Sequence, residues 1–164
     1  MEQINILNAS DSAVVANACQ TYGISTKEFT ELRSLSSAAK GKAYCPYSQF
    51  RVGATVLVDT RENESAEGPS ASGGTVSEYV SGANVENASY PVGTCAERVA
   101  FGTAVVAGMR KFRAVAVATD VSPPSSPCGM CRQFMREFCD LTTPIFMFDK
   151  DGNFVVMRMG ERSF

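Results

Sequence analysis

Hydrophobic and polar residues alternate along this chain with two different periods, which predicts a mixture of helices and strands. Phe29 and Leu32 lie at helical spacing, directly after a capping-box pair formed by Ser25 and Glu28. A helix is therefore expected from about residue 26 to residue 40. Apolar spacing and small residues predict three more helices, at residues 12–20, 97–108 and 129–138.

Short apolar runs predict the strands. Residues 112–118 are apolar almost throughout, as is typical of a strand that is covered on both faces. Strands that alternate with helices indicate an α/β fold, in which helices pack on a mixed sheet. Other runs predict strands at residues 50–58, 79–84 and 145–148, and an edge strand or a helix at residues 154–157.

The length of 164 residues fits one globular domain, residues 1–164, without a linker or an internal repeat. From residue 59 to about residue 76 the composition changes to Asn, Glu, Ser, Gly and Pro, which predicts a long polar loop. The two strands on either side of this loop are expected to form a wide hairpin.

A formal net charge of −2 gives no electrostatic footprint for nucleic acid or for an anionic membrane surface. The N-terminus has no basic segment followed by an apolar core, so a secretory signal is not expected. The longest apolar run is too short to span a bilayer. We therefore expect a soluble, cytoplasmic protein with no nucleic acid and no membrane as partner, for which a small neutral substrate is allowed.

Six cysteines and no histidine restrict the chemistry of the chain. In a reducing compartment the cysteines are not expected to form a disulfide framework, so their spacing has to reflect metal binding, catalysis or burial. Without histidine, proton transfer has to use Glu, Asp, Lys, Tyr or Cys.

The segment Pro127-Cys128-Gly129-Met130-Cys131 carries the strongest local pattern. Two cysteines three residues apart lie on one face of a helical turn, so both sulfurs can reach one ion. Pro127 and Gly129 place the pair at a helix start, where unpaired N–H groups favour thiolates. Taken alone, the pair is equally consistent with a redox dithiol or with chance.

Cys95 and Glu97 lie at the start of another predicted helix, and they change this balance. Two helix starts that each follow a strand can meet above one end of a sheet, which would bring three thiolates to one ion. A fourth position without an obvious protein ligand is typical of a catalytic zinc site. By itself, Glu97 is explained by the helix dipole. The combined pattern, Cys-x-Glu and then Pro-Cys-x-x-Cys, matches the zinc nucleobase-deaminase signature in its three-cysteine form, with the glutamate as acid and base.

Further segments extend this pattern: Tyr44-Cys45-Pro46-Tyr47-Ser48 with Phe50-Arg51-Val52-Gly53-Ala54, Asn84-Val85-Glu86-Asn87-Ala88-Ser89-Tyr90-Pro91, Cys95-Ala96-Glu97-Arg98 and Pro127-Cys128-Gly129-Met130-Cys131-Arg132-Gln133. Together they resemble the cytidine deaminase family, and most closely its short, homotetrameric branch with three cysteines. The similarity runs from about Glu28 to the C-terminus. Residues 1–24 form an extension with no firm match, and the loop at residues 59–76 is far longer than the tight turn usual in the family.

The resemblance implies a three-layer α/β/α fold with a mixed sheet of about five strands, and one Zn²⁺ per subunit held by Cys95, Cys128 and Cys131. It implies hydrolytic deamination of cytidine and deoxycytidine to uridine and deoxyuridine, at a cyclic amidine C–N bond, in pyrimidine salvage. Zinc-bound hydroxide would attack C4 of the pyrimidine. Glu97 would move protons from the water to N3 and to the departing ammonia.

The resemblance also assigns substrate contacts. Asn84 and Glu86 would bind the ribose 3′-hydroxyl, and Phe50 would pack against the pyrimidine. Backbone groups of Ala96 and Ser126 would contact the base. Without the resemblance, the first two would be turn or strand-end residues, and Phe50 an ordinary core phenylalanine.

Three more positions match the family outside these contacts. Arg98 would donate hydrogen bonds to two sulfurs and withdraw charge from the three-thiolate site, where an unrelated protein would carry a surface arginine. Tyr90 and Phe164 match residues that reach the pocket of a neighbouring subunit in the homotetramer.

The same cysteines also fit three alternative functions. In a non-catalytic zinc module, Cys45 or Cys139 would supply a fourth sulfur, although Cys139 is otherwise expected to be a small buried hydrophobe. A redox dithiol would need neither Cys95 nor Glu97. A deaminase that acts on a nucleotide or on a pyrimidine-like antibiotic would have the same metal site, but a carboxylate at position 86 favours a free 3′-hydroxyl over a phosphate.

Overall fold

The computed structural model describes residues 5–60 and 78–161. In these residues the strands form one six-stranded mixed sheet with the order β1-β6-β5-β4-β2-β3, in which β4 and β5 are parallel and all other neighbours are antiparallel. The elements follow one another as β1 (Leu7–Asn8), α1 (Ser12–Tyr22), α2 (Thr26–Ala39), the 3-10 helix η1 (Lys40–Lys42), β2 (Val52–Val58), β3 (Glu78–Ala83), the 3-10 helix η2 (Tyr90–Val92), α4 (Ala96–Val106), β4 (Phe112–Thr119), α5 (Gly129–Phe138), β5 (Pro144–Phe148) and β6 (Asn153–Arg158).

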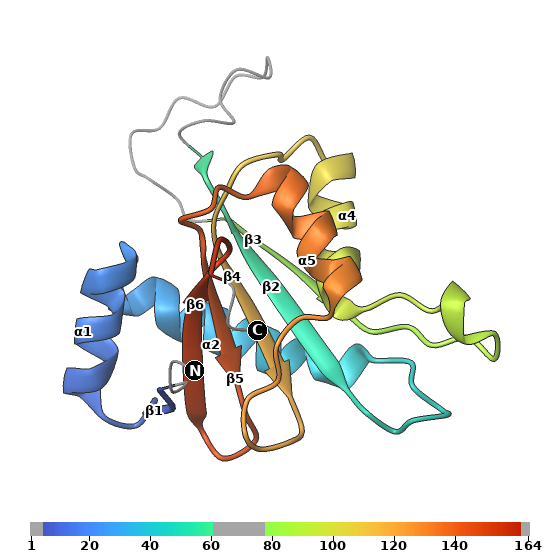
Figure 1. The fold of residues 1–164 in the computed structure, drawn as a ribbon, viewed down its shortest axis with the longest axis horizontal. Helices are drawn as coiled ribbons and strands as arrows, with labels where there is room; N and C mark the ends of the chain where they lie inside the picture. Colours follow the sequence, from blue (N-terminus) through green and yellow to red (C-terminus); the bar gives the residue numbers. More distant parts are fainter. Residues whose placement is uncertain (1–4, 61–77, 162–164) are drawn as a thin grey trace.

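Helices cover both faces of the sheet, which confirms the predicted three-layer fold (Figure 1). Strand β4 shows the division most clearly, because successive side chains of a strand point to opposite faces. Val115 and Val117 pack into the core under α4 and α5, whereas Ala114 and Ala116 pack under α1 and α2. All four side chains are buried, as expected for a strand that is covered on both sides.

The start of α2 follows the predicted capping box. The backbone N–H of Glu28 donates to Ser25 Oγ at 3.1 Å, and the backbone N–H of Ser25 donates to the Glu28 carboxylate at 2.8 Å. Glu28 also accepts from Arg113 Nη1 at 2.6 Å, at the start of β4. One carboxylate therefore caps α2 and ties it to the central strand.

One prediction needs correction. The sheet has six strands rather than about five, because Leu7–Asn8 adds β1. Residues 154–157 lie within β6, so the strand alternative is confirmed and the helix alternative is wrong. Among the described residues, the two residues of β1 pair only with Asn153 and Phe154, at the start of β6. Part of the unmatched N-terminal extension, with β1 and α1, therefore packs as an integral part of the fold. Most of the polar loop at residues 59–76 lies outside the described residues.

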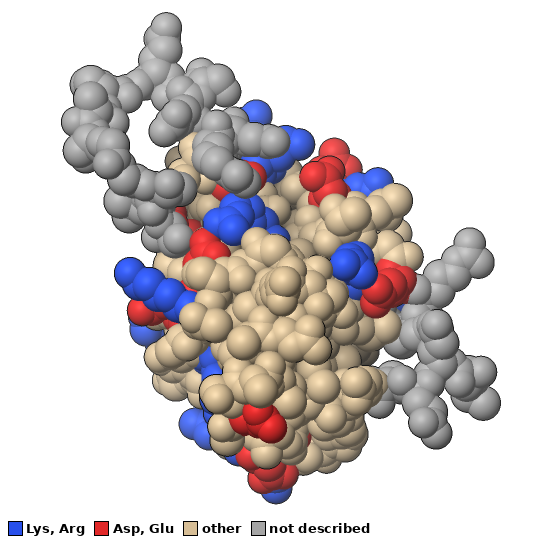
Figure 2. Space-filling model, turned by 90° about the vertical axis from the view of Figure 1, so that its left-hand side faces the viewer, with Lys and Arg blue, Asp and Glu red and all other residues tan. Residues whose placement is uncertain are grey.

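Charged side chains are mixed in sign on the face of the molecule seen in Figure 2. On the face shown in Figure 2, basic and acidic side chains of the described residues lie interspersed around a broad uncharged region, without a continuous basic stripe. No helix in residues 5–60 and 78–161 combines the length and the apolar character needed to cross a bilayer.

Helix α4 lies unusually close to strand β3, and the contact requires glycine at position 82. A Cβ atom on Gly82 would lie 2.4 Å from the backbone nitrogen of Ala100 and 2.7 Å from the carbonyl oxygen of Ala96. Neither backbone atom can move without displacing the helix. The close approach thus fixes the position of the first turn of α4 above the sheet.

We predict that Gly82→Ala destabilises the fold by at least ~1–3 kcal/mol, the usual cost of overpacking, because α4 has to move away from β3. Gly102→Ala within α4 is the matched control, because a Cβ at that position meets nothing within 4 Å. Thermal unfolding should show a lower midpoint for Gly82→Ala and an unchanged or higher midpoint for Gly102→Ala. Equal midpoints for the two variants would contradict the close approach.

Candidate active site

Three cysteine sulfurs meet where α4 and α5 begin. Helices α4 and α5 lie side by side over the same face of the sheet (Figure 1). Cys95 is the N-cap residue of α4, Cys128 is the N-cap residue of α5, and Cys131 lies in the first turn of α5. The Sγ atom of Cys128 lies 3.9 Å from that of Cys95 and 3.5 Å from that of Cys131. All three sulfurs lie within 4.8 Å of one another.

This geometry fits a zinc ion. Tetrahedral Zn²⁺ with Zn–S bonds of about 2.3 Å requires sulfurs about 3.8 Å apart, close to the observed separations. The metal-competent group found in the described residues has three members, Cys95, Cys128 and Cys131. Cys139 lies at the opposite end of α5, eight residues after Cys131 and hence about 12 Å along the helix from it. Three sulfurs leave one tetrahedral position for a non-protein ligand.

The local electrostatics favour a thiolate in this cluster. A hydrogen bond from Cys131, opposed by burial and helped by Arg98, lowers the pKa of Cys95 to about 5. The same hydrogen bond and burial raise the pKa of Cys131, so in the absence of a metal Cys95 is the thiol that ionises first. Both helix N-termini add positive potential at the sulfurs. A metal cation that binds the sulfurs can therefore readily displace the remaining thiol protons.

Glu97 lies beside the sulfurs and is almost completely buried. It follows Cys95 by two residues, in the first turn of α4, and its side chain is only 4% exposed. Burial raises the pKa of the Glu97 carboxyl, and the charge of Cys95 raises it further. Helical periodicity did not place this carboxyl near the sulfurs, but in the structure it forms a hydrogen bond with Cys131. A carboxyl with a raised pKa is suited to accept and release a proton near neutral pH.

Arg98 places a positive charge beside the cluster. Its Nη2 lies 4.0 Å from Cys95 Sγ and 3.4 Å from the carbonyl oxygen of Gly93. Its Nε atom is buried, and in the described residues it has no hydrogen-bond partner. One guanidinium nitrogen therefore lies near a sulfur of the cluster, and the Arg98 side chain is half-buried.

Asn84 connects the ends of β2 and β3 at the same end of the sheet. Its amide nitrogen donates to the carbonyl oxygen of Phe50 at 2.8 Å, and its Oδ1 accepts from the backbone N–H of Val52 at 2.8 Å. Each atom of the amide keeps one further hydrogen-bonding position, because the oxygen has two lone pairs and the nitrogen two hydrogens. Asn84 thus positions the half-buried Phe50 and can still bind a ligand.

Glu86 holds the turn before Phe50. Its carboxylate accepts from the backbone N–H groups of Tyr47 and Ser48 at 3.0 and 3.2 Å, and also from the Ser48 hydroxyl. These hydrogen bonds, led by that of the Ser48 hydroxyl, keep the pKa of Glu86 below its usual range. Sequence reasoning missed Ser48, although it lies within the Cys-Pro-Tyr-Ser motif.

The remaining predicted residues differ in their surroundings. Ala96 is fully buried between Cys95 and Glu97, and Ser126 is exposed on the segment that leads into α5. Tyr90 lies on η2 and is 91% exposed, so nothing within its own subunit covers the ring. Phe164 lies outside the described residues.

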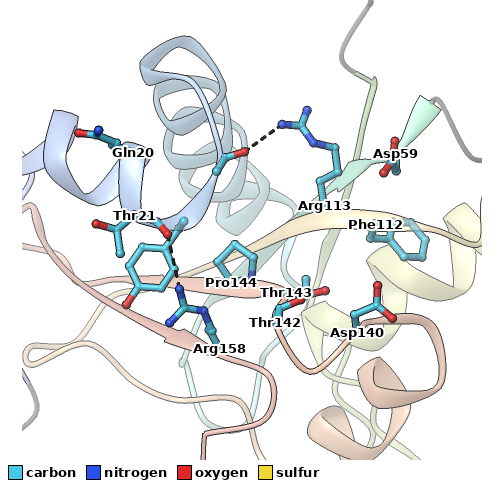
Figure 3. A pocket seen from close by; sticks show the side chains of 12 residues that line it. Gln20, Thr21, Asp59, Phe112, Arg113, Asp140, Thr142, Thr143, Pro144 and Arg158 are labelled. Atoms are coloured by element: carbon cyan, nitrogen blue, oxygen red, sulfur yellow. Dashed lines mark hydrogen bonds between the residues drawn. The ribbon is translucent and has the colours of Figure 1, made fainter.

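A separate pocket of about 440 Å³ lies at the opposite end of the sheet (Figure 3). Its lining includes the start of β4, the start of β5 and the end of β6. Its arginines make contacts within the fold: Arg113 pairs with Glu28, and Arg158 stacks 5.0 Å above the Tyr22 ring. This pocket therefore does not belong to the cysteine cluster.

Comparison with known proteins agrees with this site. The family model described as the cytidine and deoxycytidylate deaminase zinc-binding region matches residues 26–147, which include all three cysteines and Glu97. A cytidine deaminase of Sporosarcina psychrophila is 41% identical over 118 residues, which is 72% of this chain and 75% of the relative. A cytidine deaminase of Halalkalibacterium halodurans is 37% identical over 123 residues, 75% of this chain and 81% of the relative.

The fold agrees as well. A crystal structure of cytidine deaminase from Burkholderia pseudomallei superposes with a TM-score of 0.67 at 36% sequence identity. The superposed region covers 80% of this chain and 92% of the Burkholderia chain. The family match and the sulfur cluster together show that zinc is the cofactor. By sequence, by fold and by its metal site, the chain belongs to the zinc-dependent cytidine deaminase family.

Proposed function

We propose that the protein hydrolyses cytidine and deoxycytidine to uridine and deoxyuridine, with release of ammonia. The observation that carries this proposal is the cluster of three cysteine sulfurs with a buried carboxyl beside it. A metal that only stabilises a fold needs four protein ligands and no acid. A cluster of three sulfurs next to Glu97 has instead what hydrolysis requires, namely an open metal position and a proton carrier.

Cys95, Cys128 and Cys131 hold the Zn²⁺ in this proposal, and the bound ion supplies the Lewis acidity that activates water near neutral pH. Glu97 takes a proton from the attacking water and delivers it to N3 as the C4–O bond forms. Glu97 then takes the remaining proton from the oxygen now bound to C4 and transfers it to the amino nitrogen, so that the C4–N bond breaks, the C4 carbonyl forms and ammonia leaves. Burial raises the pKa of Glu97, and the carboxyl can therefore serve as base and then as acid.

The ends of β2 and β3 bind the nucleoside in this proposal. Asn84 and Glu86 contact the ribose 3′-hydroxyl, and Phe50 packs against the pyrimidine. The backbone of Ala96 and of Ser126 contacts the base. The lowered pKa keeps Glu86 negatively charged, and this charge would repel a phosphate group on the ribose. A nucleoside therefore fits better than a nucleotide. Such a reaction would serve pyrimidine salvage.

Exposed apolar residues near the site support a homotetramer. Tyr90 is 91% exposed on η2. It lies close in sequence to the metal site, because Cys95 and α4 follow η2. Large apolar side chains are exposed on the segments around the site, and a subunit interface would cover them. These side chains are Tyr44, Tyr47, Val85, Tyr90, Val92 and Met130. We propose that Tyr90 contributes to the pocket of a neighbouring subunit, and that Phe164 does so as well.

The proton carrier gives the first prediction for this proposal. Glu97→Gln and Glu97→Ala should keep zinc and the fold, while cytidine turnover falls by about 10²–10⁴-fold, because a positioned general acid and base is lost. Turnover is followed by the loss of cytidine absorbance, and zinc by elemental analysis of the purified protein. A variant with near wild-type turnover would show that the role of Glu97 is wrong.

The same assay tests the substrate. The wild-type enzyme should use cytidine and deoxycytidine, and deoxycytidylate or a cytosine-nucleoside antibiotic much less. A preference for deoxycytidylate would overturn the nucleoside assignment but leave the role of Glu97 intact.

Arg98 gives a prediction about the metal. Arg98→Ala should weaken zinc retention by about 10–100-fold, because the charge next to the thiolates is then uncompensated. Arg136→Ala at the far end of α5 is the control, since Arg136 Nη1 donates to the carbonyl oxygen of Cys139. Zinc loss is followed during titration with a chelator. Equal zinc retention in the two variants would contradict the charge-balancing role.

The proposed subunit interface at Tyr90 gives a further prediction. Light scattering should report a particle of four chains for the wild type, and Tyr90→Glu should lower this mass and raise the KM for cytidine, because a charge at a buried interface is unfavourable. Val106→Glu is the control, because Val106 is 90% exposed but lies at the far end of α4. A monomeric wild-type protein with full activity would refute the shared pocket.

A further inference from the structure

Thr119, the last residue of β4, carries a buried hydroxyl without a partner. The residue is only 2% exposed, and in the described part of the chain its Oγ1 makes no hydrogen bond. Its backbone is engaged, because the carbonyl oxygen accepts from Lys40 Nζ at 3.3 Å. Buried polar groups are almost always paired. Within the described residues, the Thr119 hydroxyl is therefore available to a hydrogen-bond partner from outside the chain.

The strand register places this hydroxyl on the face that carries the metal site. Val115 and Val117 pack under α4 and α5, and Thr119 follows Val117 by two residues, so its side chain points to the same face. Its partner across the sheet is Val52 of β2, which packs against the same core cluster. The Thr119 side chain thus points to the face of the sheet that α4 and α5 cover.

Its position across the sheet places it two strands from Asn84. Asn84 after β3, Val52 on β2 and Thr119 on β4 lie in a row at one end of three neighbouring strands. Neighbouring strands are about 4.8 Å apart, so the row spans about 10 Å from Asn84 to Thr119. In the proposed function the ribose lies at Asn84, and a nucleoside laid along this row would place its base over Val52 and the far edge of the base over Thr119. The loop after Thr119 leads to Cys128 at the start of α5.

We propose that the Thr119 hydroxyl contacts the 4-amino group of cytosine and accepts a hydrogen bond from it as it leaves as ammonia. The inference rests on the proposed function. In the step that it serves, the bond from C4 to the incoming oxygen is already formed, the C4–N bond breaks, and Glu97 supplies the proton that completes ammonia. Thr119 neither gains nor loses a proton. It orients the nitrogen so that its lone pair faces Glu97.

The test compares three variants at this position. Thr119→Val has nearly the same shape and fits a strand, but it lacks the hydroxyl. We expect kcat/KM for cytidine to fall about tenfold, as for the loss of one hydrogen bond that strengthens in the transition state, with unchanged zinc content and melting temperature. Thr119→Ser should restore kcat/KM to within about threefold of the wild type. Thr119→Ala serves if the valine variant folds poorly, because it also lacks the hydroxyl.

A probe without the leaving group separates this contact from a structural role. The ribonucleoside of 2-pyrimidinone lacks the 4-amino group, so its inhibition constant should be the same for the wild type and Thr119→Val. A wild-type kcat/KM for Thr119→Val would overturn the proposal. So would an equal loss for cytidine and for the probe, since that result indicates a distorted site. An inactive wild-type protein would refute the proposed function itself, whereas an active wild type with an inactive Glu97→Gln would leave that function standing.

Discussion

The site depends on two helix N-termini that the sheet holds together at one end. Cys95 and Cys128 are the N-cap residues of α4 and α5, so their sulfurs meet only if both helices start above the same strand ends. The separations of 3.9 and 3.5 Å between the sulfurs leave little room for displacement. The close contact of α4 with Gly82 supplies the necessary precision for one helix.

The same arrangement explains how a chain without histidine can handle a metal and a proton. Helix dipoles and Arg98 stabilise thiolates, and burial of the first turn of α4 raises the pKa of Glu97. A three-thiolate ligand set places more negative charge on the metal than a set with histidine, and a nearby guanidinium offsets this charge. Fold and chemistry are thus coupled, because the turn that positions the sulfurs also buries the acid.

Local signals in the sequence were sufficient for the elements and for the cysteines. The capping box at Ser25 predicted the start of α2, and the spacing of Cys128 and Cys131 predicted one helical turn. Features that depend on strand pairing could not be predicted in this way. The pairing of β1 with β6 joins residues that are distant in sequence. The burial of the Thr119 hydroxyl without a partner likewise depends on which of the described elements pack around the end of β4. Burial of Glu97 also required the three-dimensional structure, because helical spacing alone points it away from Cys95.

The central claim is that one metal ion has three sulfur ligands and one exchangeable position. X-ray absorption at the zinc edge of the purified protein measures this directly. We expect three sulfurs at about 2.3 Å and one oxygen or nitrogen at about 2.0 Å, whose signal changes when a nucleoside inhibitor binds. Four sulfurs, or a protein without zinc, would contradict this coordination.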